Sequence, residues 1–170
     1  MIVAVIADTH MPRGARRLPV DHLQHADAIL HAGDFMELSV LHELQALGKP
    51  VHAVRGNVDS HELIVRLPLQ RTVRFGDVQI GMVHDAGPAK GRLERLRRRF
   101  PDADAVVFGH SHLPHDEVID GVRFFNPASA GPRRFDFPTS VGLIDGKRAM
   151  HIALDDRSVG ALEKRMNQMG

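Results

Sequence analysis

The sequence contains no cysteine, no tryptophan and no tyrosine. A chain without cysteine has no disulfide, no thiolate zinc site and no cysteine nucleophile. Any metal ligands must therefore be histidine, aspartate, glutamate or asparagine side chains. No apolar stretch approaches the roughly 20 residues that a membrane-spanning helix needs. These absences argue against disulfide scaffolds, thiol enzymes and helical membrane proteins.

An excess of one charge is also absent. The 22 Lys and Arg residues balance the 21 Asp and Glu residues and leave a net charge of +1 when histidine is neutral. This balance does not indicate a nucleic-acid or membrane partner. Residues 1–7 are apolar but lack the basic segment and cleavage site of a signal peptide. We therefore expect a cytoplasmic protein, and the length of 170 residues predicts a single domain over residues 1–170.

The first third of the sequence alternates between short apolar runs and helical patterns. The predicted strands are residues 2–7, 27–34 and 51–57, and each apolar run ends in polar residues. A short helix from about residue 20 and a helix over residues 37–47 separate these strands. The alternation predicts a parallel α/β layer, in which functional groups gather at the carboxyl ends of the strands.

After residue 67 the predicted strands become shorter and more alternating. They cover residues 71–75, 78–84 and 104–110, and two hairpins are predicted over residues 117–125 and 141–154. One helix is predicted over residues 93–100. A final helix is predicted near the C-terminus, where Leu162, Met166 and Met169 share a face.

Histidine, by contrast, is abundant, with twelve residues in the chain. Several of them stand with acids and an amide at the ends of predicted strands. Such groups suit Mn²⁺, Zn²⁺, Fe²⁺ or Ni²⁺ better than an all-oxygen Ca²⁺ or Mg²⁺ site. They exceed the need of one tetrahedral ion but fit two ions that share a bridging carboxylate. The candidate ligands are Asp8, His10, Asp34, Asn57, His84, His110 and His112.

The spacing of these residues suggests how they are grouped. In an extended segment, residues i and i+2 point the same way. Asp8 and His10 are therefore predicted to bind one ion, and His110 and His112 to contribute to one shared site. Glycines precede Asp34, Asn57 and His110 in the sequence, and we expect them to permit sharp turns and keep bulk away from the metals.

The ordered motifs D-x-H, G-D, G-N, H and G-H-x-H resemble those of the calcineurin-like metallophosphoesterase superfamily, in particular its small bacterial and archaeal phosphodiesterase branch. Residues 126–129, "NPAS", are similar to the N-P-G-S segment of that branch. The resemblance implies a two-sheet α/β sandwich of mixed sheets flanked by helices in four layers. It also implies a metal-dependent phosphodiesterase that uses two divalent ions, manganese before nickel, iron or zinc, and a metal-bound hydroxide.

The resemblance also implies roles for individual residues. Asp34 would bridge the two ions. The first ion would be held by Asp8, His10, Asp34 and His112, and the second by Asp34, Asn57, His84 and His110. The predicted catalytic residues are Asp34, Asn57, His84 and Asp59.

Three positions depart from the family pattern. Many members have a histidine after the G-N asparagine that assists the leaving group, but Val58 stands here. Good leaving groups should therefore be favoured, and monoesters disfavoured. Asp85 replaces the usual glycine after His84, where its carboxylate could tune the second metal or hinder substrate. Ala128 replaces the glycine of N-P-G-S, which is a mild change.

Other charged residues have less specific interpretations. The arginines of residues 92–100 are expected to form the solvated face of a helix, because the leucines and Phe100 form a core stripe. Arginines near the predicted ligands could bind substrate phosphate. The candidates are Arg13, Arg16, Arg17, Arg133 and Arg134.

The remaining histidines are not expected to be ligands. His115 is predicted to be a surface or substrate-proximal residue. Ordinary structural roles are expected for His22, His25, His31, His42, His52, His61 and His151.

Two other functions remain open. One is a specific nucleotidase or dinucleotide polyphosphate hydrolase. The other is a protein-binding scaffold, because a eukaryotic membrane-trafficking subunit resembles this branch in fold but uses the fold to bind proteins. The predicted partner is a phosphoester small molecule or nucleotide, with no membrane or nucleic-acid partner. A homo-oligomer is an expectation from the family resemblance.

Overall fold

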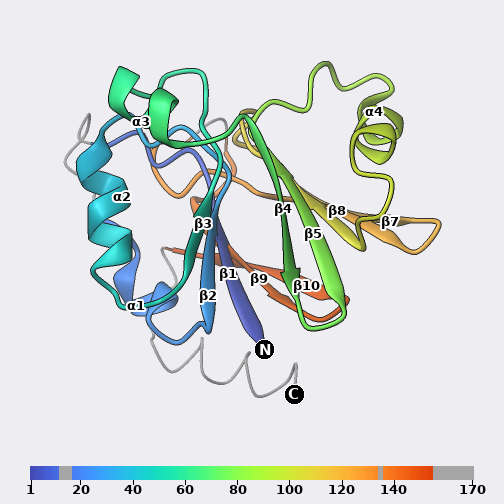
Figure 1. Cartoon of the computed structure of the whole chain (residues 1–170), viewed down its shortest axis with the longest axis horizontal. Coiled ribbons are helices and arrows are strands. Elements are labelled where there is room, and N and C mark those ends of the chain that lie inside the picture. The colour runs from blue at the N-terminus through green and yellow to red at the C-terminus, as the bar shows by residue number, and fades with distance from the viewer. Residues whose placement is uncertain (12–16, 134–135, 155–170) are drawn as a thin grey trace.

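The computed structural model describes residues 1–11, 17–133 and 136–154, which form two five-stranded sheets (Figure 1). The first sheet has the strand order β10-β9-β1-β2-β3. Its strands are β1 (Ile2–Ile6), β2 (Ala28–His31), β3 (Val51–Ala53), β9 (Ser140–Asp145) and β10 (Arg148–Ala153). β1, β2 and β3 run parallel, whereas β9 and β10 form an antiparallel hairpin.

The second sheet has the order β4-β5-β6-β8-β7. Its strands are β4 (Gln70–Phe75), β5 (Val78–Val83), β6 (Ala105–Val107), β7 (Pro114–Ile119) and β8 (Val122–Pro127). β5 and β6 are parallel, so the segments that follow them begin at the same edge of this sheet. Between the two sheets lies an apolar core that includes Val5, Leu30, Met82 and Phe125, all fully buried.

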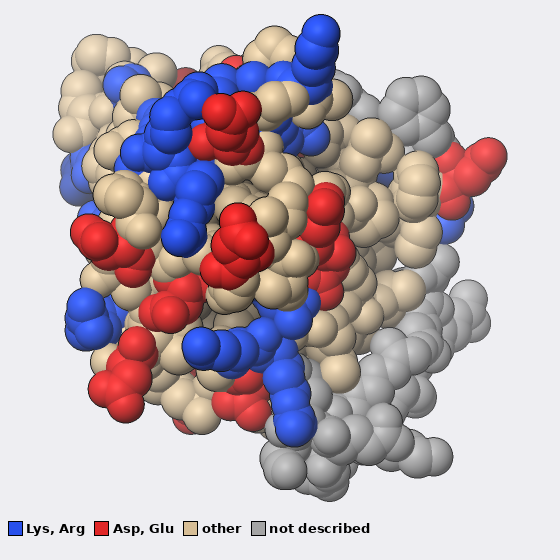
Figure 2. All heavy atoms as spheres, turned by 90° about the vertical axis from the view of Figure 1, so that its right-hand side faces the viewer, with Lys and Arg blue, Asp and Glu red and all other residues tan. Residues whose placement is uncertain are grey.

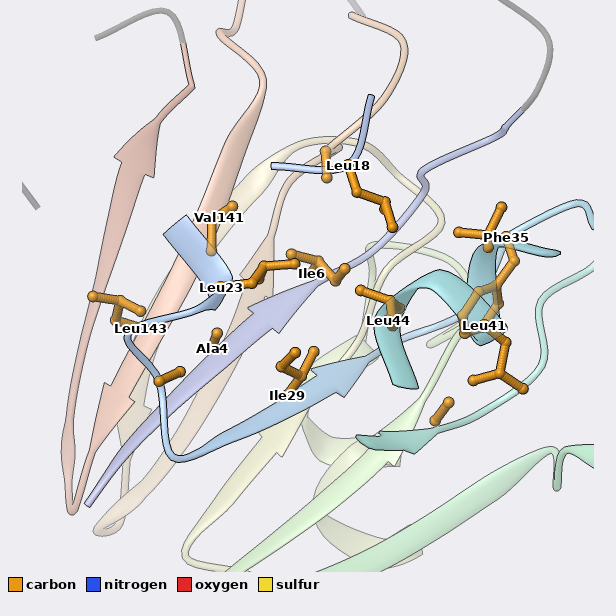
Figure 3. Packing of buried hydrophobic residues seen from close by; sticks show 14 of the residues in the cluster. Ala4, Ile6, Leu18, Leu23, Ile29, Phe35, Leu41, Leu44, Val141 and Leu143 are labelled. Atoms are coloured by element: carbon orange, nitrogen blue, oxygen red, sulfur yellow. The ribbon is translucent and has the colours of Figure 1, made fainter. Parts of the chain in front are cut away.

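Helices cover both outer faces of the sandwich (Figure 1). α1 (Val20–Leu23) and α2 (Leu38–Gln45) pack on the first sheet, where Leu23 and Leu44 meet Ile6 and Ile29 (Figure 3). α4 (Arg92–Arg99) packs on the second sheet through Leu96. These apolar stripes bury the outer faces of strands whose inner faces already line the central core, which explains the continuous apolar runs in the sequence.

The predicted two-sheet sandwich with outer helices is confirmed, and so are the predicted strands and hairpins to within a few residues. A fourth helix, α3 (His61–Arg66), was not predicted. It has only six residues, of which Leu63 is buried while Ile64 and Val65 are exposed, so one core-facing residue is too few for a helical periodicity to be detected. The helix expected near the C-terminus lies outside the described residues. No helix within the described ranges is long and apolar enough to cross a membrane.

Candidate metal centre and active site

All seven predicted ligands lie just beyond the carboxyl ends of strands. Asp8 and His10 follow β1, Asp34 follows β2 and Asn57 follows β3. From the second sheet, His84 follows β5, and β6 is followed by His110 and His112. A hydrogen bond of 3.1 Å from the His110 amide to Asp8 Oδ2 joins the two sheets at this edge.

The backbone at these residues is unusual. Eight described non-glycine residues have positive φ, and five of them are predicted ligands: Asp8 (55°), His10 (47°), Asp34 (61°), His110 (70°) and His112 (59°). Such conformations cost roughly 1–3 kcal/mol each and cluster at functional sites. The prediction that the D-x-H and H-x-H pairs lie in extended segments is therefore wrong, because the chain turns at each ligand.

Two compact groups of ligand atoms result, each with its atoms within 4.8 Å of one another. The first contains Asp8, His10 and His112, and the second contains Asp34, His84 and His110. His10 thus joins Asp8 as the spacing suggested. His110 and His112 belong to separate groups, which is the arrangement that the family resemblance implies, and their contribution to one shared dinuclear site stays a prediction. The left-handed turns at both histidines send the two side chains apart.

Asp34, a member of the second group, also faces the first. Its Oδ2 atom is 3.4 Å from Nε2 of His10 and 3.3 Å from Nε2 of His84. Its other oxygen, Oδ1, accepts a hydrogen bond of 3.1 Å from the amide of Val58. One carboxylate oxygen therefore faces both groups while the other is held by the backbone.

The contacts of His84 fit a metal ligand. Nδ1 lies 2.8 Å from the carbonyl oxygen of Ala32, which can only accept, so Nδ1 carries a proton and donates it. Nε2 then faces Asn57 Oδ1 at 3.1 Å as well as Asp34. Asn57 Oδ1 is also 2.9 Å from Nδ1 of His110. Several acceptors converge here, and only a proton or a metal ion between them makes this arrangement favourable.

The electrostatics of the site agree with this reading. Hydrogen bonds to Asp34 and then Asp8 raise the pKa of His10 to about 9. Burial lowers the pKa of His84, but its hydrogen bond to Asp34 and the nearby carboxylates outweigh that effect and raise it. Burial opposes ionisation of Asp34, yet the hydrogen bonds from His10 and His84 hold its pKa well below the usual range. The carboxylates of Asp8 and Asp34 are therefore ionised, and their negative charge favours a bound cation.

A comparison over most of the sequence identifies the family. The family model of the calcineurin-like phosphoesterase superfamily domain matches residues 1–149. This chain belongs to the calcineurin-like phosphoesterase superfamily. Its membership makes it a metal-dependent phosphoester hydrolase, as the recognised motifs predicted.

Relatives of this phosphoesterase extend over most of its length. A probable metallophosphoesterase of Methanothermobacter thermautotrophicus is 33% identical over 154 residues, which cover 87% of this chain and 88% of the relative. Phosphodiesterase YfcE of Escherichia coli is 27% identical over 144 residues, or 82% of this chain and 76% of the relative. Among solved structures, Vps29 of Entamoeba histolytica complexed with zinc has a TM-score of 0.74 and 26% identity, and covers 93% of this chain and 95% of that one.

Mn²⁺ binding by the phosphoesterase is expected to strengthen as the pH rises toward about 9. The sign follows from the raised pKa of His10, because below that pKa a proton occupies the nitrogen that a metal needs. Each pH unit below the pKa reduces the neutral imidazole roughly tenfold. Calorimetric Mn²⁺ titrations at about pH 6.5, 7.5 and 8.5, each in two buffers of different ionisation enthalpy, measure both affinity and proton release. An affinity that is constant over this range would contradict the prediction.

The glycine before Asn57 allows close approach of two loops. A Cβ atom at Gly56 would lie 2.0 Å from Oδ1 of Asp34 and 2.3 Å from its backbone nitrogen. Gly56 therefore keeps bulk away from the ligands as expected, because any side chain at this position would collide with Asp34.

Gly56→Ala is expected to destabilise the fold by at least about 1–3 kcal/mol and to weaken Mn²⁺ binding, because the backbone at Asp34 must shift. The matched control is Gly76→Ala, whose added Cβ would meet nothing within 4 Å and which tests backbone strain alone at φ +59°. Thermal unfolding and metal titration of both variants provide the comparison. Equal Mn²⁺ affinity in the two variants would be the contrary result.

Asp59, which was predicted to be catalytic, is buried and uses both carboxylate oxygens for backbone hydrogen bonds. Oδ1 accepts the amide of Met36 at 2.9 Å, and Oδ2 accepts the amide of Gly56 at 2.7 Å. Met36 lies two residues after Asp34, and Gly56 directly precedes Asn57. The carboxylate thus ties together the two loops that carry these ligands.

The "NPAS" segment supports the ligands from behind. Asn126 Nδ2 donates to the carbonyl of Gly109 at 3.0 Å, and Ser129 Oγ donates to the carbonyl of Asp8 at 2.9 Å. Ala128, at the position of the family glycine, is fully buried with φ 67°, and its amide donates to Asn126 Oδ1. The replacement of glycine by alanine thus leaves the turn intact.

The second departure, Asp85, also has a local structural role. Its Oδ1 accepts the amide of Gly87 at 2.7 Å and shapes the loop between β5 and α4. Arg95 holds the same loop through the carbonyls of Lys90 at 2.8 Å, Ala86 at 3.2 Å and Pro88. The Asp85 carboxylate is accommodated next to His84 because it accepts a hydrogen bond from this loop.

Arg95 is one of several basic residues on α4. Figure 2 shows the face that carries α4, where Lys and Arg side chains gather beside acidic ones. Arg98 pairs with Glu94 at 2.9 Å, and Arg92 lies 5.7 Å from the ring centroid of Phe108. Leu96 is buried beneath them, which agrees with the expected helix whose basic face is solvated.

The predicted substrate-binding arginines are only partly described. Arg13, Arg16 and Arg134 lie outside the described residues. Arg133 is exposed, and Arg17 lines a surface pocket with Leu18 and neighbouring residues. Their contact with substrate stays a prediction.

His115 lies on β7, half-buried, with its ring 5.7 Å from that of Phe108 and Nε2 3.5 Å from Glu117. It belongs to neither group of metal-ligating atoms. The expectation that it is a surface or substrate-proximal residue stays a prediction.

Proposed function

We propose that this phosphoesterase is a metal-dependent phosphodiesterase with a dinuclear centre. The observation that carries the proposal is the position of one Asp34 oxygen, 3.4 Å from His10 and 3.3 Å from His84. A single carboxylate oxygen that faces two groups of ligands is placed to bridge two ions. The strained backbone at five of the proposed ligands supports the same conclusion.

In this proposal the first ion is held by Asp8, His10, Asp34 and His112, and the second by Asp34, Asn57, His84 and His110. The mixture of carboxylate, amide and imidazole donors favours Mn²⁺, with Ni²⁺, Fe²⁺ and Zn²⁺ as alternatives. Two such ions would supply an activated hydroxide for attack on phosphorus and would neutralise charge on the phosphoryl oxygens.

The exposure of the proposed ligands and the residue at position 58 support a proposal on substrate entry and on the favoured ester. Asn57 and His110 are the exposed members of the proposed ligand set, whereas Asp8, Asp34, His84 and His112 are buried, so a phosphoester would approach from the side of Asn57 and His110. Val58, which stands where many relatives have a histidine, is 40% exposed and provides no proton for a leaving group. We therefore infer a preference for diesters with good leaving groups over monoesters.

The test is hydrolysis of an activated aryl phosphodiester against the matching aryl monoester. The protein is stripped with a chelator and then titrated with Mn²⁺, Ni²⁺ or Zn²⁺. Metal-dependent cleavage of the diester with little monoester turnover is the expected result. Metal binding without cleavage of either ester, or cleavage that does not depend on metal, would overturn the proposal.

A nucleotidase or dinucleotide polyphosphate hydrolase remains the alternative enzyme, and a panel of nucleotides and dinucleoside polyphosphates separates it from a general phosphodiesterase. The scaffold alternative is less well supported, because all seven ligand positions keep metal-binding side chains and scaffolds typically lose some. We further propose a cytoplasmic location and allow for a homo-oligomer, which gel filtration with light scattering tests.

A further inference from the structure

His31, the last residue of β2, is fully buried and lies beneath the candidate metal centre. Its Nδ1 is 3.1 Å from the amide of Gly33, and its Nε2 is 3.1 Å from Oγ1 of Thr9. The imidazole also stacks on Phe35, with ring centroids 3.4 Å apart. Every polar atom of this side chain is therefore engaged.

The donors and acceptors determine the state of the ring. The amide of Gly33 can only donate, so Nδ1 accepts and the proton lies on Nε2. Nε2 then donates to Thr9 Oγ1, whose own proton is directed to the carbonyl oxygen of Asp34 at 3.4 Å. Burial keeps the ring neutral by lowering the pKa of His31 to about 3.

The partners of His31 lie in the two loops that carry the first ligands. Thr9 lies between Asp8 and His10, and Gly33 directly precedes Asp34. The two loops run side by side through the bonds from the Asp8 amide to the Gly33 carbonyl and from the His10 amide to the Asp34 carbonyl, both 3.0 Å. The backbone groups that form these two hydrogen bonds lie beyond the ends of β1 and β2. His31 adds a side-chain link across the two loops from below.

We propose that His31 is a positioning residue, which sets the left-handed turns at Asp8, His10 and Asp34 through Thr9 and Gly33 and thereby pre-organises both metal sites. This inference rests on the proposed dinuclear function. A neutral imidazole suits this position because it can bridge an amide donor and a hydroxyl without placing a second positive charge beside the ions.

The link between His31 and Thr9 can be tested by a double-mutant cycle. His31→Asn keeps an acceptor for the amide of Gly33 but is too short to reach Thr9, and Thr9→Val removes the same link from the other side. Each variant is expected to weaken Mn²⁺ binding about ten- to hundredfold by calorimetry. Thr9→Val also removes the hydrogen bond from Thr9 to the carbonyl of Asp34, but His31→Asn should have little further effect in this background, because the link between His31 and Thr9 is already absent there.

Ile29→Ala is the matched control, since Ile29 lies on the same strand and is fully buried in the core on the α-helical side. It is expected to lower the unfolding temperature while leaving Mn²⁺ affinity within about twofold of the wild type, an outcome typical of loss of packing alone. Unfolding is followed without metal for every variant. If His31→Asn does not fold, His31→Gln and His31→Phe are compared instead. Glutamine can donate to Thr9 and phenylalanine cannot, so His31→Gln should retain Mn²⁺ affinity better than His31→Phe.

The outcomes separate this inference from the proposed function. If the wild type binds Mn²⁺ and cleaves the diester but His31→Asn binds Mn²⁺ equally well, His31 is only a core residue and the inference is wrong. Additive losses in the cycle would also overturn it. If the wild type binds none of Mn²⁺, Ni²⁺ and Zn²⁺, the proposed function fails, and the inference about His31 fails with it.

Discussion

Replacing Asp34 with asparagine is expected to lower metal-dependent diester turnover by more than about a hundredfold, since even the outer partners of metal ligands contribute ten- to hundredfold. The asparagine oxygen can still accept the amide of Val58, which now reaches Asp34 Oδ1 at 3.1 Å. Its amide group would then face His10 and His84 in place of the negative Oδ2. The shape is kept and the bridging charge is lost, so the variant is expected to bind fewer Mn²⁺ ions per chain.

Asp77→Asn is the control for Asp34→Asn, because Asp77 is an exposed carboxylate in the turn between β4 and β5. The control should retain wild-type turnover and metal content. Metal content by elemental analysis and initial rates with saturating Mn²⁺ complete the experiment. Unchanged turnover in Asp34→Asn would refute a bridging role for this carboxylate.

The sequence predicted that the seven proposed ligands lie close together, because each follows an apolar strand and parallel strands bring their carboxyl ends to one edge of a sheet. Periodicity alone could not predict how those ligands are grouped. The extended geometry assumed for the i, i+2 pairs fails because positive φ values at Asp8, His10, His110 and His112 turn the chain at all four residues of these pairs. Aspartate and histidine adopt left-handed conformations more often than most residues, but this preference is too weak to predict them at particular positions, where tertiary contacts impose them.

The supporting residues were also beyond the reach of the sequence. His31 was expected to have an ordinary role, although a histidine that ends an apolar strand directly before a G-D motif is a weak signal for a buried polar contact. Its partners, Thr9 and Gly33, are evident only when β1 and β2 are paired in register. Likewise, Asp59 is part of the sequence motif G-N-V-D, but the motif does not show that its two oxygens accept hydrogen bonds from amides in two different loops.

Asp59→Asn is expected to reduce Mn²⁺ affinity about ten- to hundredfold and to leave the pH profile of turnover unchanged. One of the two amides, of Met36 or Gly56, would face the asparagine NH₂ group, and donor would meet donor. Asp59→Ala would leave both amides without a partner, at a cost of about 1–3 kcal/mol each in unfolding free energy. The loss of turnover arises from misplaced ligands, so excess Mn²⁺ should restore part of it.

This experiment distinguishes two roles for Asp59. A carboxylate that transfers a proton in the reaction would alter the pH profile when replaced, and added metal would not restore the rate. A carboxylate that only joins the Asp34 and Asn57 loops would change metal affinity and stability together. The matched control is Asp102→Asn, an exposed carboxylate after α4, which should change neither. Because Asp59 already has both oxygens bonded to backbone amides, we expect the second pattern, with Asp59 stabilising the geometry on which the bridging oxygen of Asp34 depends.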